Sequence, residues 1–125
     1  MPTIEPLLPD DLGQVYLTSP TGIRCVISAA DVCCQNDHFT ATPSIDGRPA
    51  NGVRFTSAGE LTWTLGDLGN IPAIELDSTY TYTALGWTIT TTPAGDTVFI
   101  AHDQGTAALI VSAATAGTHA HPRPT

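Results

Sequence analysis

Lysine is absent from this 125-residue chain, and four arginines are its only strongly basic residues. Charged residues make up 13% of the sequence, about half of the ~25% that is typical of globular proteins. Nucleic acids and anionic lipids are recognised by clustered lysine and arginine. Here Arg24, Arg48, Arg54 and Arg123 are scattered, and the formal net charge is −8. We therefore expect no nucleic-acid partner and no electrostatic docking on a membrane.

Long apolar runs are also missing. No segment approaches the ~18–20 apolar residues that a membrane-spanning helix requires, so we expect no transmembrane segment. The first residues, MPTIEPLLPDD, lack the basic and apolar regions of a signal peptide. We expect that a signal segment, if the protein is exported, is not present in this chain. The length and the 42% share of hydrophobic residues suit a single domain with one core.

A sustained helical period is not found in the sequence, because glycine or proline interrupts nearly every window of a dozen residues. Threonine and the β-branched and aromatic residues dominate the segments between, and these residues favour strands. The pattern predicts strands at Gln14–Thr18, Gly22–Ile27, Val32–Asn36, Gly52–Thr56, Leu61–Leu65, Thr79–Ala84, Trp87–Thr92, Thr97–Ala101 and Ala107–Ala114. One helical turn is expected in PLLPDDLGQ, near the start of the chain.

Turn signals recur roughly every 8–12 residues between these strands, as in all-β sandwiches and barrels. The sequence therefore predicts an all-β fold, a single-domain antiparallel sandwich or barrel of about eight to ten short strands. We expect an N-terminal extension at residues 1–13, the β domain at residues 14–115 and a flexible C-terminal tail at residues 116–125.

Cysteine is scarce, and all three cysteines lie in GIRCVISAADVCCQN, at Cys25, Cys33 and Cys34. A structural zinc site needs two ligand pairs, typically C-x₂₋₄-C with a second Cys or His pair. These spacings supply no such set, even with His38 nearby. A dithiol redox site needs C-x-x-C, which is absent. We expect neither a metal nor another cofactor.

A hairpin explains the cysteines better. If SAAD (Ser28–Asp31) forms the turn, Cys25 faces Cys34, and facing residues share one side of a sheet. Such partners are close enough for a disulfide, which favours an oxidising compartment. Cys33 then points to the opposite face as a free thiol. Three reduced, buried cysteines in a cytosolic protein are the alternative.

Two motifs resemble those of a known group. LTSPTGIRCVI, followed by VCCQN, and the later YTALGWTI occur in this order. They resemble an S-P-S/T-G-N-I-x-C…C hairpin and a Y-x-A-x-G-W-x-I segment of small secreted and lipoprotein-type proteins of mycobacteria and related actinobacteria. The resemblance runs from about Val15 to Ser112 and maps the cysteine pair of that group onto Cys25 and Cys34.

The chain departs from that group in two places. No asparagine stands between Gly22 and Ile23, and QGTAAL replaces a T-G-H-G turn. No activity is established for these proteins, so the resemblance implies a compartment, secreted or anchored in the cell envelope, rather than a chemistry.

Catalytic motifs are missing: the sequence has no G-x-S-x-G, H-E-x-x-H, P-loop or G-x-G-x-x-G. His102 and Asp103 are adjacent, but neighbouring side chains on a strand point apart. A cysteine nucleophile would need a histidine partner, which for Cys33 could be His38 or His102. The carboxylates available for glycoside chemistry are Asp10, Asp11, Glu60, Asp67, Glu75, Asp77, Asp96 and Asp103. Their spatial separation, which decides that chemistry, cannot be read from sequence.

Three aromatic residues are the candidate ligand contacts: Trp63, Tyr80 and Tyr82. Tyr80 and Tyr82 share one face of their strand and could stack on a sugar or a partner, although strand aromatics are more often part of a core. The sequence favours a non-catalytic extracytoplasmic β domain that binds a protein, glycan or lipid partner. An envelope-acting hydrolase and an assembly subunit of a surface or virion particle are the alternatives. The sequence does not indicate an oligomeric state.

Overall fold

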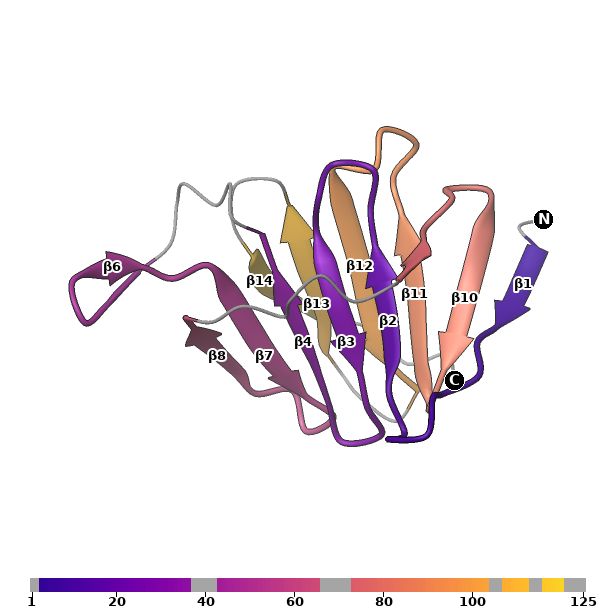
Figure 1. The fold of residues 1–125 in the computed structure, drawn as a ribbon, viewed down its shortest axis with the longest axis horizontal. Coiled ribbons are helices and arrows are strands. Elements are labelled where there is room, and N and C mark those ends of the chain that lie inside the picture. The colour runs from indigo at the N-terminus through magenta and orange to yellow at the C-terminus, as the bar shows by residue number, and fades with distance from the viewer. Residues whose placement is uncertain (1–2, 37–42, 66–72, 104–106, 113–115, 121–125) are drawn as a thin grey trace.

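The computed structural model describes residues 3–36, 43–65, 73–103, 107–112 and 116–120. Two six-stranded sheets pack face to face (Figure 1). The first contains, in spatial order, β1 (Thr3–Pro6), β10 (Tyr80–Ala84), β11 (Trp87–Thr91), β12 (Thr97–His102), β13 (Ala107–Ser112) and β14 (Ala116–Ala120). The second contains β8 (Leu61–Thr64), β7 (Gly52–Thr56), β4 (Asp31–Gln35), β3 (Arg24–Ile27), β2 (Val15–Thr18) and β9 (Ile74–Glu75). A separate two-stranded sheet joins β5 (Ser44–Ile45) and β6 (Arg48–Pro49).

The predicted all-β sandwich is confirmed, and no helix occurs within the described residues. The described part of the chain has fourteen strands, more than the eight to ten expected. Several of the additional strands are short pieces such as β1 and β9, whose side chains are exposed. Such strands are defined by pairing with a neighbour and leave little alternation of apolar and polar residues in the sequence. One of the turn signals, GDLGN at residues 66–70, lies outside the described residues.

Segments near both ends of the chain join the first sheet. Residues 3–6, which were expected to belong to an extension, form β1 and pair in parallel with β10. Residues 116–120, which were expected to belong to a flexible tail, form β14 and pair with β13. The expected helical turn is also absent from its segment. In its place, the Oδ1 atom of Asp10 accepts hydrogen bonds from the main-chain N–H groups of Leu12 and Gln14.

The core lies between the two sheets and follows directly from the period-two pattern. Alternate residues of each central strand face inward, and Phe55 of the second sheet meets Trp87 of the first with ring centroids 6.0 Å apart. The largest fully buried side chains are Trp87, Phe55, Leu17, Ile23, Ile27, Ile89, Ile100, Leu109, Val32, Val53, Val98 and Val111. Burial of each large apolar side chain contributes about 1.5–3 kcal/mol, so this layer holds the sheets together.

A hydrogen bond also links the sheets at one end of the sandwich. The indole Nε1–H of Trp87 donates to the carbonyl of Ser28, 2.9 Å away, in the turn between β3 and β4. A buried indole N–H without a partner would carry a desolvation cost of about 1–3 kcal/mol. This bond satisfies it and fixes the β3–β4 turn against β11.

Candidate functional site

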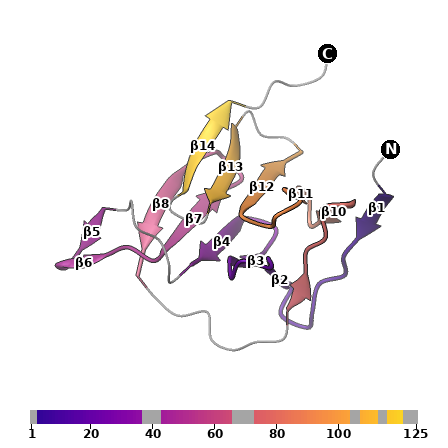
Figure 2. The ribbon, with the colours of Figure 1, turned by 90° about the horizontal axis from the view of Figure 1, so that it is seen from above.

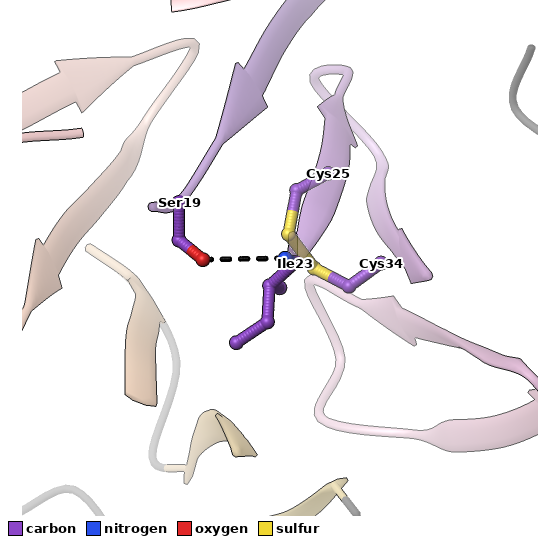
Figure 3. The surroundings of a disulfide bond; sticks show 4 residues. All are labelled: Ser19, Ile23, Cys25 and Cys34. Carbon is purple, nitrogen blue, oxygen red and sulfur yellow. Dashed lines mark hydrogen bonds between the residues drawn. A yellow bond between two sulfur atoms is a disulfide. The ribbon is translucent and has the colours of Figure 1, made fainter. Parts of the chain in front are cut away.

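Cys25 and Cys34 form a disulfide, as predicted (Figure 3). They are directly opposed partners of β3 and β4, and both are buried. Next to the bond, the Ser19 hydroxyl accepts a 3.2 Å hydrogen bond from the main-chain N–H of Ile23. The disulfide therefore ties β3 to β4, and the Ser19 bond closes the β2–β3 turn where β3 begins.

Cys33 is a free cysteine, half-buried on the outer face of the second sheet. Its register partners are Val26 on β3 and Arg54 on β7. Burial raises the pKa of the Cys33 thiol, the nearby carboxylate of Asp31 raises it further, and Arg54 lowers it. A nucleophilic cysteine needs the opposite shift, toward the thiolate. His38, one of its two predicted partners, lies outside the described residues.

His102, the other predicted partner, belongs to the first sheet and packs inward. Its ring meets that of Trp87 edge-on, with centroids 4.8 Å apart. Asp103 is exposed, and its Oδ1 accepts a 3.2 Å hydrogen bond from the Thr88 hydroxyl. His102 is thus an inward-facing neighbour of Trp87, and Cys33 lies on the outer face of the other sheet.

The three aromatic candidates do not form one surface. Tyr82 is a core residue with 4% of its side chain exposed, because it faces inward on β10. Tyr80 is exposed at the start of the same strand, and the two rings lie 5.9 Å apart. Trp63 packs against the core from β8, at the opposite side of the sandwich from β10. Tyr82 is thus part of the core rather than of a binding surface. Its hydroxyl accepts a 2.9 Å hydrogen bond from the Asp77 N–H.

A cleft of about 410 Å³ lies at the end of the sandwich opposite to Trp87 and Ser28. Three chain segments form its walls: Pro20 in the β2–β3 turn, Glu75–Ser78 from the end of β9 onward, and Thr91, Thr92, Pro93 and Gly95 from the end of β11 into the β11–β12 turn. These segments come from both sheets, so the cleft exists only because the sheets pack in this register.

Two of its walls are joined directly. The Thr21 hydroxyl donates a 2.6 Å hydrogen bond to the carbonyl of Gly95. Gly95 is buried with φ near +73°, and a Cβ atom there would lie only 2.6 Å from Cδ of Pro20. Only glycine therefore fits where the β11–β12 turn approaches the β2–β3 turn. The two turns are thus held together without a ligand.

The third wall is held by hydrogen bonds of its own. The main-chain N–H of Leu76 donates to the carbonyl of Thr18 over 2.8 Å. The carboxylate of Asp77 accepts from the N–H and the hydroxyl of Thr79, at 2.8 and 2.7 Å. These two hydrogen bonds lower the pKa of Asp77 below its usual value. The carboxylate is consequently ionised at neutral pH and fixed in position.

The lining is rich in oxygen, and the described residues that form it include no cation. Its polar side chains are Glu75, Asp77, Ser78, Thr91 and Thr92, and its apolar ones are Pro20, Leu76 and Pro93. Ionised carboxylates only accept hydrogen bonds, and hydroxyls donate and accept. The lining therefore suits a ligand that donates hydrogen bonds and disfavours an anionic one. Within the described part of the chain, no three His, Cys, Asp or Glu residues cluster as a metal site.

Glu75 and Asp77 were among the candidate carboxylates in the sequence, but the sequence did not predict that they line the same cleft. The other lining residues gave only ordinary turn signals, such as PAGD at Pro93–Asp96. Their meeting depends on contacts such as that between Thr21 and Gly95, which are 74 residues apart.

Comparison with known proteins finds no matching family model, curated protein or solved structure. No described helix is long and apolar enough to cross a membrane.

Proposed function

We propose that this protein is an extracytoplasmic, non-catalytic binding domain of a secreted or envelope protein, and that it holds a neutral glycan in the cleft at the end of its sandwich. The observation that carries this proposal is the preformed, oxygen-lined cleft built by three turns of both sheets.

The Cys25–Cys34 disulfide supports the extracytoplasmic part of the proposal. Structural disulfides persist in oxidising compartments and are rare in a reducing cytosol. The resemblance of the cysteine hairpin and the Gly86–Trp87 segment to secreted actinobacterial proteins supports the same compartment.

The lining supports the choice of a neutral glycan. The carboxylates of Glu75 and Asp77 accept hydrogen bonds from sugar hydroxyls, and the hydroxyls of Ser78 and Thr92 exchange them. Pro20 and Pro93 provide apolar surface for the C–H face of a sugar ring. An acidic glycan is repelled, since the protein carries a formal charge of −8 and the described residues around the cleft include no cation.

Binding is favoured over hydrolysis because both carboxylates of the cleft are exposed. A glycosidase needs one carboxyl group that stays protonated, which usually requires burial in apolar surroundings. Asp77 is exposed and its pKa is lowered, and Glu75 is exposed as well. His102 lies at the opposite end of β12 from the turn that lines the cleft. A general acid is therefore missing among the described residues of the cleft.

Calorimetric titration with neutral oligosaccharides of hexoses, pentoses and N-acetylhexosamines tests the proposal. A uronic-acid oligosaccharide serves as the anionic comparison. We expect binding of at least one neutral oligosaccharide and none of the anionic one. Glu75→Ala should weaken that binding about tenfold, because a hydrogen bond to a charged group contributes about 1.5–3 kcal/mol.

Glu60→Ala is the matched control, since Glu60 is also exposed but lies in the β7–β8 turn, outside the cleft. Equal affinities of the two variants would place the ligand elsewhere. Absence of binding to every neutral oligosaccharide would refute the glycan proposal.

A further inference from the structure

An Asp-Gly pair forms the tip of the β5–β6 hairpin, which stands apart from both six-stranded sheets (Figure 2). Asp46 and Gly47 have φ values of 52° and 81°, in the left-handed region that tight two-residue hairpin turns require. Both residues are exposed. The hairpin is closed by two residue pairs and, at its base, by a 2.8 Å hydrogen bond from the Ala50 N–H to the Pro43 carbonyl. The tip is therefore open to water and held by few contacts.

The Asp46–Gly47 sequence is of the kind that rearranges without an enzyme. The glycine nitrogen can attack the carboxyl carbon Cγ of the preceding aspartic acid, because no Cβ atom shields that nitrogen. The new N–Cγ bond closes a succinimide ring, and the amide proton leaves with the carboxyl hydroxyl group as water. A second water molecule then opens the ring at the main-chain carbonyl carbon. The product is isoaspartate, whose main chain runs through the former side chain, and no oxidation or reduction occurs.

The structure leaves the Asp46 carboxyl group free to move. Among the described residues, no hydrogen bond fixes it, whereas Asp10 and Asp77 accept hydrogen bonds from main-chain N–H groups. No atom lies within 4 Å of the Cβ position of Gly47, so the ring closes without meeting a neighbour. The turn must rotate before Cγ can reach the glycine nitrogen, and only the short hairpin opposes that rotation.

A second reactive pair, Asn51–Gly52, is held within the second sheet instead. Gly52 is buried, begins β7 and pairs with Gln35 on one side and Thr64 on the other. The Asn51 N–H donates to the Thr64 carbonyl over 3.2 Å, and the Asn51 carbonyl accepts from the Asn36 N–H over 2.9 Å. The main-chain rotation that forms a succinimide would break this pairing in the middle of the chain's largest contacts. Reaction at Asn51 therefore requires opening of the sheet.

We propose that Asp46 is a site of spontaneous modification, at which the folded protein converts to isoaspartate, and that the fold protects Asn51. In an unstructured chain the order is reversed, because a neutral amide is attacked more readily than an ionised carboxylate. The product adds a main-chain carbon to the two-residue turn and disrupts the β5–β6 pairing. The sandwich stays intact, since the hairpin is a separate sheet. The site is also separate from the cleft, whose lining includes no residue of the hairpin.

Ageing of the folded protein beside a urea-unfolded sample tests this order. Both are kept at physiological pH and temperature and sampled over time. An endoproteinase that cleaves before aspartate reports on residue 46, because isoaspartate at that position blocks the cut. Deamidation of Asn51 is read from the mass of its peptide. In the folded protein, we expect Asp46 to isomerise within about threefold of its rate in urea, and Asn51 to deamidate at least about a hundredfold more slowly than in urea.

Asp46→Glu is the matched control. It keeps the carboxylate, but its longer side chain closes the corresponding ring far more slowly, so enzymatic methyl labelling of isoaspartate should be lost in the aged, folded variant. Unchanged labelling of Asp46→Glu would place the isoaspartate elsewhere and overturn the proposal. An unmodified Asp46 in the folded protein, after the urea sample has converted, would overturn it as well. Equal rates of Asn51 deamidation in the folded and unfolded samples would contradict the protection.

Discussion

Thr21 and Gly95 meet across the two sheets: the Thr21 hydroxyl donates a 2.6 Å hydrogen bond to the Gly95 carbonyl. Pro20 packs against Gly95 at the same place, where a Cβ atom would have no room. The two turns that wall the cleft are therefore one structural unit. Rigid walls reduce the entropy lost on binding, so the stability of this contact bears directly on the proposed function.

Substitution of Gly95 measures how much its contact with Pro20 contributes to the free energy of unfolding. Gly95→Ala incurs the strain of a positive φ, about 1 kcal/mol, and a clash with Pro20. Gly13→Ala is the matched control, because Gly13 has nearly the same φ (+75°) but no atom within 4 Å of the added Cβ. Urea denaturation should show a loss of unfolding free energy at least about 1 kcal/mol larger for Gly95→Ala. Equal losses would mean that the Pro20 contact has no energetic weight.

The disulfide gives a second prediction. Cys34→Ser should lower the free energy of unfolding by roughly 2–3 kcal/mol, the value expected for closing so short a loop. Cys33→Ser should cost much less, because Cys33 is only half-buried and lies outside the bond. Denaturant titrations of both variants, with a non-reducing peptide map of the native protein, provide the test. A Cys25–Cys33 bridge in that map would contradict the observed register.

The thiol of Cys33 gives a pH-dependent prediction. Burial and Asp31 raise its pKa, and Arg54 lowers it. The midpoint of the alkylation rate against pH should lie higher in the folded protein than in urea. Asp31→Asn should move this midpoint down, and Arg54→Gln should move it up.

The same shift links pH to stability. Because the folded pKa is raised, the contribution of Cys33 to stability is complete below the unfolded pKa of about 8.5. It is lost as pH rises through the folded pKa. A folded midpoint equal to the unfolded one would show that neither burial nor Asp31 acts on this thiol.

Local patterns in the sequence were enough to predict the sandwich and its disulfide. The alternation in strands such as Trp87–Thr91 records burial on one face. The four-residue turn Ser28–Asp31 fixes the hairpin register, since the Ser28 N–H donates to the Asp31 carbonyl. Once that register is set, Cys25 must face Cys34.

The remaining features depend on contacts between distant segments. β1 exists because β10 offers an unpaired edge, and its own side chains carry no burial pattern. Tyr82 has the same aromatic ring as Tyr80, yet one is in the core and the other is exposed, because only Tyr82 lies deep enough between the sheets. The cleft depends on turns from both sheets meeting, which no local pattern records.

The proposed function requires that the ligand binds at the cleft end of the sandwich. Chemical-shift mapping of the ¹⁵N-labelled protein, titrated with the neutral oligosaccharide that binds best, tests it most directly. We expect perturbed amide signals at Ser78, Thr92 and Gly95, with Ser28 and Gly86 at the opposite end unchanged. Perturbation centred on Ser28 and Gly86, with the cleft residues unmoved, would contradict it.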